Sequence, residues 1–158
     1  MNREILFKAK RLDNGEWFEG VPVDVTPLVC FASDKVAQEV VMVRAGFADW
    51  GMPRGLEYTK VDPSTVCEYT GLTDSNGKRV FCGDILKFRD EPNDYEWVGR
   101  VEFGNPNGGY TWGWQLIHIS GPKPNMDTLC WFDMEESGAY SEVIGSIHDG
   151  EGGQREEG

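Results

Sequence analysis

Short runs of alternating apolar and polar residues, ended by loops rich in glycine, proline and asparagine, most constrain how this chain can fold. The first run is the clearest, because in ILFKAK the apolar Ile5, Phe7 and Ala9 lie at every second position, as on one face of a strand. Asn14-Gly15 follows and supplies the positive φ angles of a tight turn, and the chain returns at Trp17. Alternation on both sides of such a turn predicts a β-hairpin.

Further strands are expected along the rest of the chain. From residue 26 to 60 the pattern is looser: Ser33 could cap a short helix, but the β-branched run VVMV favours a strand at 40–44. Another short strand is expected at 58–61. Five more are expected at about 84–89, 97–103, 109–119, 128–132 and 142–148, separated by loops such as DEPND, GNPNG and SGPKPN. This spacing predicts a mostly β fold that ends in a small β-barrel.

The length of 158 residues suits one domain, or one domain with a small subdomain. The Gly- and Pro-containing segment before residue 62 and the turn DPSTV after it suggest a change of subdomain there. We therefore expect an N-terminal β-rich region at 1–62 and a C-terminal barrel at 63–149. The tail GEGGQREEG, at 150–158, has no apolar side chain with which to pack, and a disordered acidic tail is expected.

Charge restricts the class of partner. Fifteen Lys and Arg against 27 Asp and Glu give a net charge of −12, and an acidic field of this size repels phosphate backbones. Direct nucleic-acid binding is therefore the less favoured interpretation, and a basic protein partner or another copy of the chain fits better. No apolar run approaches the roughly 20 residues of a membrane helix, and the N-terminus lacks the apolar core of a signal peptide. We expect a cytoplasmic protein without membrane contact.

The residues that most often carry metal or catalytic chemistry are scattered. Four cysteines stand singly, with no CxxC pair, which favours reduced core cysteines over a metal site. His118 and His148 are the two histidines, and neither lies in a recognisable nucleophile motif. Asp84 lacks an acid or base partner nearby in the sequence, so local bonds to backbone N–H groups are its expected role. We expect no catalytic residue, no metal and no cofactor.

The segment GGYTWGWQLIHIS contains the most suggestive candidate surface. In a strand, Tyr110, Trp112 and Trp114 point to one side, together with Leu116 and His118. Such a row could stack nucleobases or bind a peptide. Ordinary core packing or a subunit interface is the favoured interpretation, because aromatic side chains stabilise sheets and are enriched at interfaces. The candidate interface residues are Tyr110, Trp112, Trp114 and Trp131.

The most specific stretch is CEYTGLTDSNGKRVFCGDILKF, at residues 67–88. Its YTGL corner, its turn DSNGK and its GDI strand start, with the much later segment SEVIGSIHD, resemble the YopX family of phage and prophage proteins. The matching positions are 69–72, 74–78, 83–85 and 142–147, and Phe7, Lys8 and Ala9 fit the family's opening strand. Residues 26–58 and 95–131 match no motif of the family, and Ser146 stands where the family often has Asn.

The resemblance implies a mostly β fold with an SH3-like C-terminal barrel and homo-oligomers, and it brings no established catalytic residues. The expected function is therefore that of a phage or prophage accessory protein of uncharacterised role, non-enzymatic, acting as a protein-interaction or self-assembling module. A nucleic-acid-associated β-barrel protein is the alternative, and a small-molecule enzyme is less favoured still.

Overall fold

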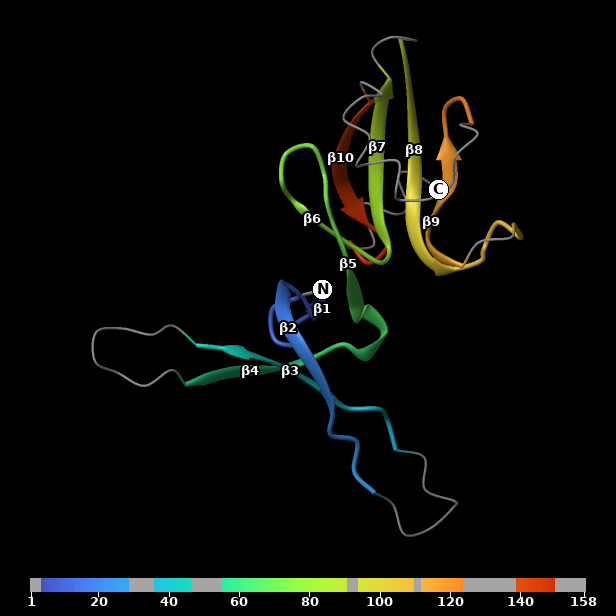
Figure 1. Ribbon diagram of the computed structural model, residues 1–158. Coiled ribbons are helices and arrows are strands. Elements are labelled where there is room, and N and C mark those ends of the chain that lie inside the picture. Colours follow the sequence, from blue (N-terminus) through green and yellow to red (C-terminus); the bar gives the residue numbers. More distant parts are fainter. Residues whose placement is uncertain are drawn as a thin grey trace, which may run out of the picture. The chain divides into compact units, whose positions relative to one another are not determined.

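The computed structural model describes residues 4–28, 36–46, 55–90, 94–109, 112–123 and 139–149. It divides the chain into two compact units, Met1–Glu68 and Tyr69–Gly158, and each is described by itself. Within the described ranges the chain forms ten strands and one short 3-10 helix, and no α-helix (Figure 1). The fold is therefore mostly β, as predicted. In these ranges, no helix is long and apolar enough to cross a membrane.

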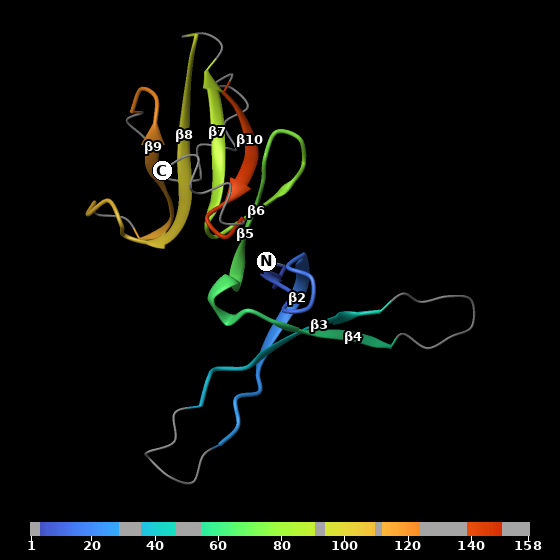
Figure 2. The ribbon, with the colours of Figure 1, turned by 180° about the vertical axis from the view of Figure 1, so that it is seen from behind.

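The first unit is an antiparallel sheet of short strands. Its strands are β1 (Phe7–Lys10), β2 (Trp17–Asp24), β3 (Val40–Ala45), β4 (Leu56–Val61) and the start of β5 (Cys67–Thr73). Their order is β4-β3-β2-β1-β5, and Figure 2 shows β3 and β4 side by side. The 3-10 helix η1 (Pro63–Thr65) precedes β5, and the Asp62 side chain caps it by accepting a hydrogen bond from the Ser64 N–H at 3.0 Å. The strand predicted from VVMV is confirmed as β3.

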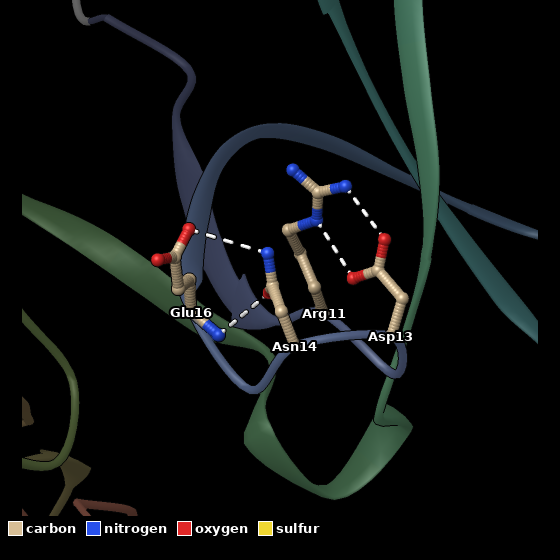
Figure 3. A network of polar contacts seen from close by, with 4 residues as sticks. All are labelled: Arg11, Asp13, Asn14 and Glu16. Carbon is tan, nitrogen blue, oxygen red and sulfur yellow. Dashed lines mark hydrogen bonds and ion pairs between the residues drawn. The ribbon is translucent and has the colours of Figure 1, made fainter.

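The predicted N-terminal hairpin is confirmed as β1 and β2, with Lys10 opposite Trp17. Gly15 supplies the positive φ of the turn, at 71°, whereas Asn14 keeps a negative φ. Side chains brace the turn (Figure 3): the Arg11 guanidinium donates two hydrogen bonds to Asp13, at 2.9 and 2.7 Å. Asn14 accepts from the Glu16 N–H at 2.9 Å and donates to its carboxylate at 3.2 Å.

The second unit contains the rest of β5 and a four-stranded sheet. The strands are β6 (Arg79–Phe81), β7 (Asp84–Asp90), β8 (Tyr95–Gly104), β9 (Gly113–Ser120) and β10 (Ala139–Ser146). The sheet has the antiparallel order β10-β7-β8-β9. These strands match the predictions near 84–89, 97–103, 109–119 and 142–148 in place, while the predicted strand at 128–132 and the tail at 150–158 lie outside the described residues.

Each unit has its own apolar core. In the second unit, the Phe88 and Trp97 rings stack with their centroids 4.0 Å apart, because the two residues are directly opposite each other on β7 and β8. Gly99 makes room for this pair, since a Cβ at Gly99 would lie 2.9 Å from the Trp97 ring. The buried residues of this core are Val80, Leu86, Phe88, Trp97, Val101 and Leu116, and those of the first unit are Ala9, Phe18, Val40, Met42 and Val61.

Neither sheet closes into a barrel within the described residues, so the SH3-like barrel expected for the C-terminal part is not confirmed. The division between units falls after Glu68. The expected domain boundary at 62/63 stays a prediction.

Two phenylalanines of the second unit give a matched test of core packing. Phe88 is 1% exposed and Phe103 is 60% exposed. We expect Phe88→Ala to lower the free energy of unfolding by about 3–5 kcal/mol, because it removes a buried ring and leaves a cavity. Phe103→Ala should cost well under about 1 kcal/mol. Urea unfolding of both variants measures the difference, and similar losses would contradict the assignment of Phe88 to the core.

The hairpin turn gives a test by titration. The hydrogen bonds from Arg11 hold the pKa of Asp13 below its ordinary value. Since the pKa of Asp13 is lower in the folded protein than in the unfolded chain, the Arg11–Asp13 pair stabilises the fold above the unfolded-chain pKa of Asp13. This stabilisation is lost as pH falls through the pKa of Asp13 in the folded protein. We expect Arg11→Gln to raise the pKa of Asp13. Arg11→Lys should raise it less, because lysine keeps the positive charge but lacks the paired N–H donors of the guanidinium group. Carboxyl-carbon NMR titration measures both, and an unchanged pKa in Arg11→Gln would refute this cause.

Candidate functional site

The turn between β5 and β6 folds around the carboxylate of Asp74, which is 6% exposed. Its Oδ1 accepts hydrogen bonds from the Asn76 N–H at 2.9 Å and the Lys78 N–H at 2.8 Å. The Asp74 N–H donates to the Lys78 carbonyl at 2.8 Å, and Gly77 adopts a φ of 81°. The DSNGK motif is therefore a self-capped turn, in which an aspartate binds the backbone that follows it.

The same turn is bonded to β10, far along the chain. Asp74 Oδ2 accepts from the Val143 N–H at 2.9 Å, across 69 positions of sequence. The Ser75 N–H donates to the Ser141 carbonyl at 3.0 Å, and Ser75 Oγ accepts from the Ser141 N–H at 2.9 Å. The DSNGK turn and the closing motif, which lie far apart in the sequence, thus meet, and the Asp74 carboxylate accepts hydrogen bonds from both.

Asp84, the aspartate of the GDI motif, also binds backbone. It is fully buried, and its Oδ2 accepts from the Phe81 N–H at 2.8 Å, as the sequence predicted for a bond to local backbone. The preceding Gly83 adopts a φ of 83°. Its N–H donates to the Val101 carbonyl, and its carbonyl accepts from the Ile147 N–H. The motif thus joins β7, β8 and the segment after β10.

The closing motif is held in a similar way. Asp149 Oδ2 accepts from the Ser146 N–H at 2.7 Å, and Ser146 Oγ accepts from the His148 N–H at 3.2 Å. Ser146, at the position where the YopX family often has Asn, thus takes part in a local turn through its side-chain hydroxyl. The motif residues form a framework of hydrogen bonds to the backbone that joins the strands of this unit.

The predicted aromatic row is divided between core and surface. Leu116 is 3% exposed in the core, and Trp114 is partly buried against that core. Trp112 comes just before β9 and is 79% exposed. Tyr110 and Trp131, the other two predicted interface residues, lie outside the described residues. Of the predicted set, the structure therefore brings Trp112 and Trp114 to the same end of β9.

Phe103, at the end of β8, completes this group, and the sequence prediction missed it. It is directly opposite Trp114, and the two rings meet edge to face with centroids 4.9 Å apart. We call Phe103, Trp112 and Trp114 the aromatic cluster. Alternation along β8 places Phe103 on the same face as Trp97 and Val101, and this signal could have identified it.

The loop between β8 and β9 is tied to the strands that bear the aromatic cluster. Asn107 donates from its side chain to the Leu116 carbonyl at 3.1 Å, and Asn105 donates to the Gly109 carbonyl at 2.6 Å. Gly108 takes a positive φ of 73°. GNPNGG is thus a hairpin loop, as predicted, and its hydrogen bonds hold the strand ends next to it in place.

Histidine and cysteine side chains are dispersed. His118 Nε2 lies 2.7 Å from the Gly121 carbonyl, in the turn after β9. Cys67 is buried, and its thiol donates to the Thr65 carbonyl, while Cys82 is half-buried. Cys30 and Cys130 lie outside the described residues. In the part of the chain that the structure describes, no group of three or more His, Cys, Asp or Glu side chains could hold a metal ion.

Asp74 gives a sharp test of the framework. In Asp74→Asn the amide can supply one oxygen to the turn, but its NH₂ group would face the N–H of Val143. We expect Asp74→Asn to lower the free energy of unfolding by about 1–3 kcal/mol, and Asp74→Ala to lower it at least as much, since buried donors lose their acceptor.

Asp94 supplies the matched control, because it is exposed and has a φ of 52°, which Asn also tolerates. We expect Asp94→Asn to change stability by less than about 0.5 kcal/mol. Urea unfolding gives the energies, and amide exchange at Val143 should be faster in both Asp74 variants. Wild-type exchange at Val143 in Asp74→Ala would show that the carboxylate does not hold β10.

The DSNGK, GDI and EVIGS segments all lie within the part of the chain that matches a family model. A search of curated proteins finds no match, and a search of solved structures finds none. A family model described as YopX protein matches residues 28–151, which is most of the chain. The chain belongs to the YopX family.

Proposed function

We propose that this chain is a phage or prophage accessory protein that acts in the bacterial cytoplasm, without enzymatic activity, as a protein-interaction or self-assembling module. Its partners in this proposal are a basic protein and other copies of the chain. The SH3-like barrel belongs to the same proposal. It is supported by Val80 of β6, which packs into the core of the four-stranded sheet.

The exposed aromatic cluster is the observation that carries the proposal. Trp112 and Phe103 are 79% and 60% exposed, and the Phe103 ring contacts Trp114, which packs against the core. Large aromatic side chains exposed near one end of a sheet mark interaction sites, since aromatic anchors dominate binding energy when a partner covers them. Antiparallel strands and a bonded hairpin loop hold these rings, so little order has to be gained on binding.

The framework around Asp74 supports a non-enzymatic role. The carboxylates of Asp74, Asp84 and Asp149 accept hydrogen bonds from backbone N–H groups, which is what a structural carboxylate does. General acid–base chemistry instead needs a carboxylate or imidazole directed at a substrate. The net charge of −12 supports the choice of a basic partner, because an acidic field attracts positive surfaces and speeds their encounter.

A nucleic-acid-binding role is the second candidate, and Trp112 is the observation that favours it. An exposed indole can stack on an unpaired base, and such stacking tolerates any sequence. The acidic net charge opposes this role, because binding to phosphates depends on Lys and Arg contacts.

Affinity capture from host and phage-infected lysates, with and without nuclease, tests the proposal. The bait is the tagged full chain, compared with the double variant Phe103→Ala/Trp112→Ala and with Ile119→Ala. Ile119 is the matched control, since it is an exposed apolar residue at the other end of β9. We expect a nuclease-resistant protein partner that the double variant captures at least about tenfold less, whereas Ile119→Ala captures it normally.

Two results would overturn the proposal. Partners that disappear with nuclease, and whose binding falls steeply with added salt, would favour the nucleic-acid role. Equal capture by wild type and the double variant would show that the aromatic cluster is not the binding site.

A further inference from the structure

Positively charged side chains lie over aromatic rings at several places in the first unit. Lys8 Nζ is 4.5 Å from the centroid of the Trp17 ring, and Lys10 Nζ is 5.2 Å from it. The Arg44 guanidinium is 4.1 Å from the centroid of the Phe18 ring. These distances lie within the range of cation–π attraction, in which the negative face of a ring attracts a positive charge.

The aromatic cluster of the second unit differs from these sites, because its own stretch of chain contains no charge. Residues 103–122 include no Lys, Arg, Asp or Glu, although 27% of the whole chain is charged. The stretch 124–149 contains six Asp and Glu and no Lys or Arg. These neighbouring parts of the chain therefore supply no cation to the cluster.

The charge of the second unit favours a cation from another molecule. This unit has 16 Asp and Glu against seven Lys and Arg, whereas the first unit has 11 against eight. Most of the net charge of −12 thus belongs to the unit that carries the aromatic cluster. An acidic field attracts positively charged groups and raises their concentration near the surface.

Trp112 is the ring of the cluster that is most open to such a cation, since it is 79% exposed. A Cβ added at Gly104 would lie 3.8 Å from the Trp112 ring, so the indole lies beside the backbone at the end of β8. Phe103 precedes Gly104 and is 60% exposed. Of the aromatic side chains, tryptophan attracts cations most strongly.

We propose that the aromatic cluster binds an arginine side chain of the basic partner, with the guanidinium over the Trp112 ring. Arginine fits better than lysine, because its guanidinium is planar, stacks on aromatic faces and is more weakly hydrated than an ammonium group. Arginine is also enriched at protein interfaces, where lysine is depleted. A planar group can stack on an exposed ring, so this binding needs no cavity.

The inference rests on the proposed function, because it names the side chain through which the basic partner binds. The two can fail separately. Loss of a captured partner in Phe103→Ala/Trp112→Ala supports the aromatic cluster as a binding site whatever the charge of the partner. The measurements below depend on the charge itself.

NMR of the isotope-labelled full chain, at about 0.15 M salt so that the net charge is screened, is the first measurement. The probes are a capped peptide Gly-Arg-Gly and the same peptide with citrulline, an uncharged side chain of nearly the same shape as arginine. Trp112→Phe removes one indole N–H signal and thereby assigns it.

We expect the arginine peptide to shift the Trp112 indole signal, and the citrulline peptide to bind at least about threefold more weakly. The control is the indole signal of Trp17, which should not move, because lysine side chains of the chain itself already lie over that ring.

A series of substitutions tests the ring. Trp112→Phe keeps an aromatic face that attracts cations less strongly, and Trp112→Leu keeps only an apolar side chain. The arginine signals of the peptide report binding, and we expect about twofold weaker binding to Trp112→Phe and about fivefold weaker binding to Trp112→Leu. Ile119→Ala is the matched control and should bind as wild type does. None of these changes alters the net charge, and urea unfolding checks that each variant folds.

Four outcomes would overturn the inference. The first is a Trp112 signal that does not move with up to about 20 mM arginine peptide, a concentration at which contacts of very low affinity are visible. The second is equal binding of the arginine and citrulline peptides, which would show that the charge is not recognised. The third is equal binding by wild type and Trp112→Leu. The fourth is a shift of the Trp112 signal by oligothymidine and not by the arginine peptide, which would assign the ring to nucleobase stacking.

Discussion

One buried carboxylate joins two motif segments of this protein that lie far apart in the sequence. Asp74 is desolvated, and its two oxygens accept from three backbone N–H groups, two in its own turn and one on β10. An ionised carboxylate is costly to bury unless such donors surround it, and with them it joins two distant segments. Together with the pairing of β10 to β7, this arrangement holds β10, which carries most of the closing motif.

The sequence predicted those features that local chemistry decides. Gly15 and Gly77 both turned out to be positive-φ turn residues, and VVMV formed a strand because β-branched residues favour one. The bond from Asp84 to nearby backbone was also foreseeable from a short polar side chain next to a glycine. Family membership followed from the same local motifs, since each is a turn or a strand start with its own residue requirements.

Non-local features escaped prediction because they depend on strand pairing. Nothing near Asp74 in the sequence indicates Val143 as its partner, and Phe103 joins the aromatic cluster through its register with Trp114. The alignment of Val21, Val43 and Tyr58 across β2, β3 and β4 likewise follows only from strand register. A barrel was expected from the number and spacing of strands, but the closure of a sheet depends on pairing between its edges, which spacing does not encode.

The hydrogen bonds between the DSNGK turn and β10 also protect the protein from a hazard of β-rich chains. β10 is the last strand of its sheet, and the backbone groups of Ser141 and Val143 that point away from β7 would be open to pairing with a strand from another molecule. Asp74 accepts from the Val143 N–H, and Ser75 bonds both the N–H and the carbonyl of Ser141. The turn thus closes a sheet edge against fibre-like growth, so the same few residues that set the architecture also limit aggregation.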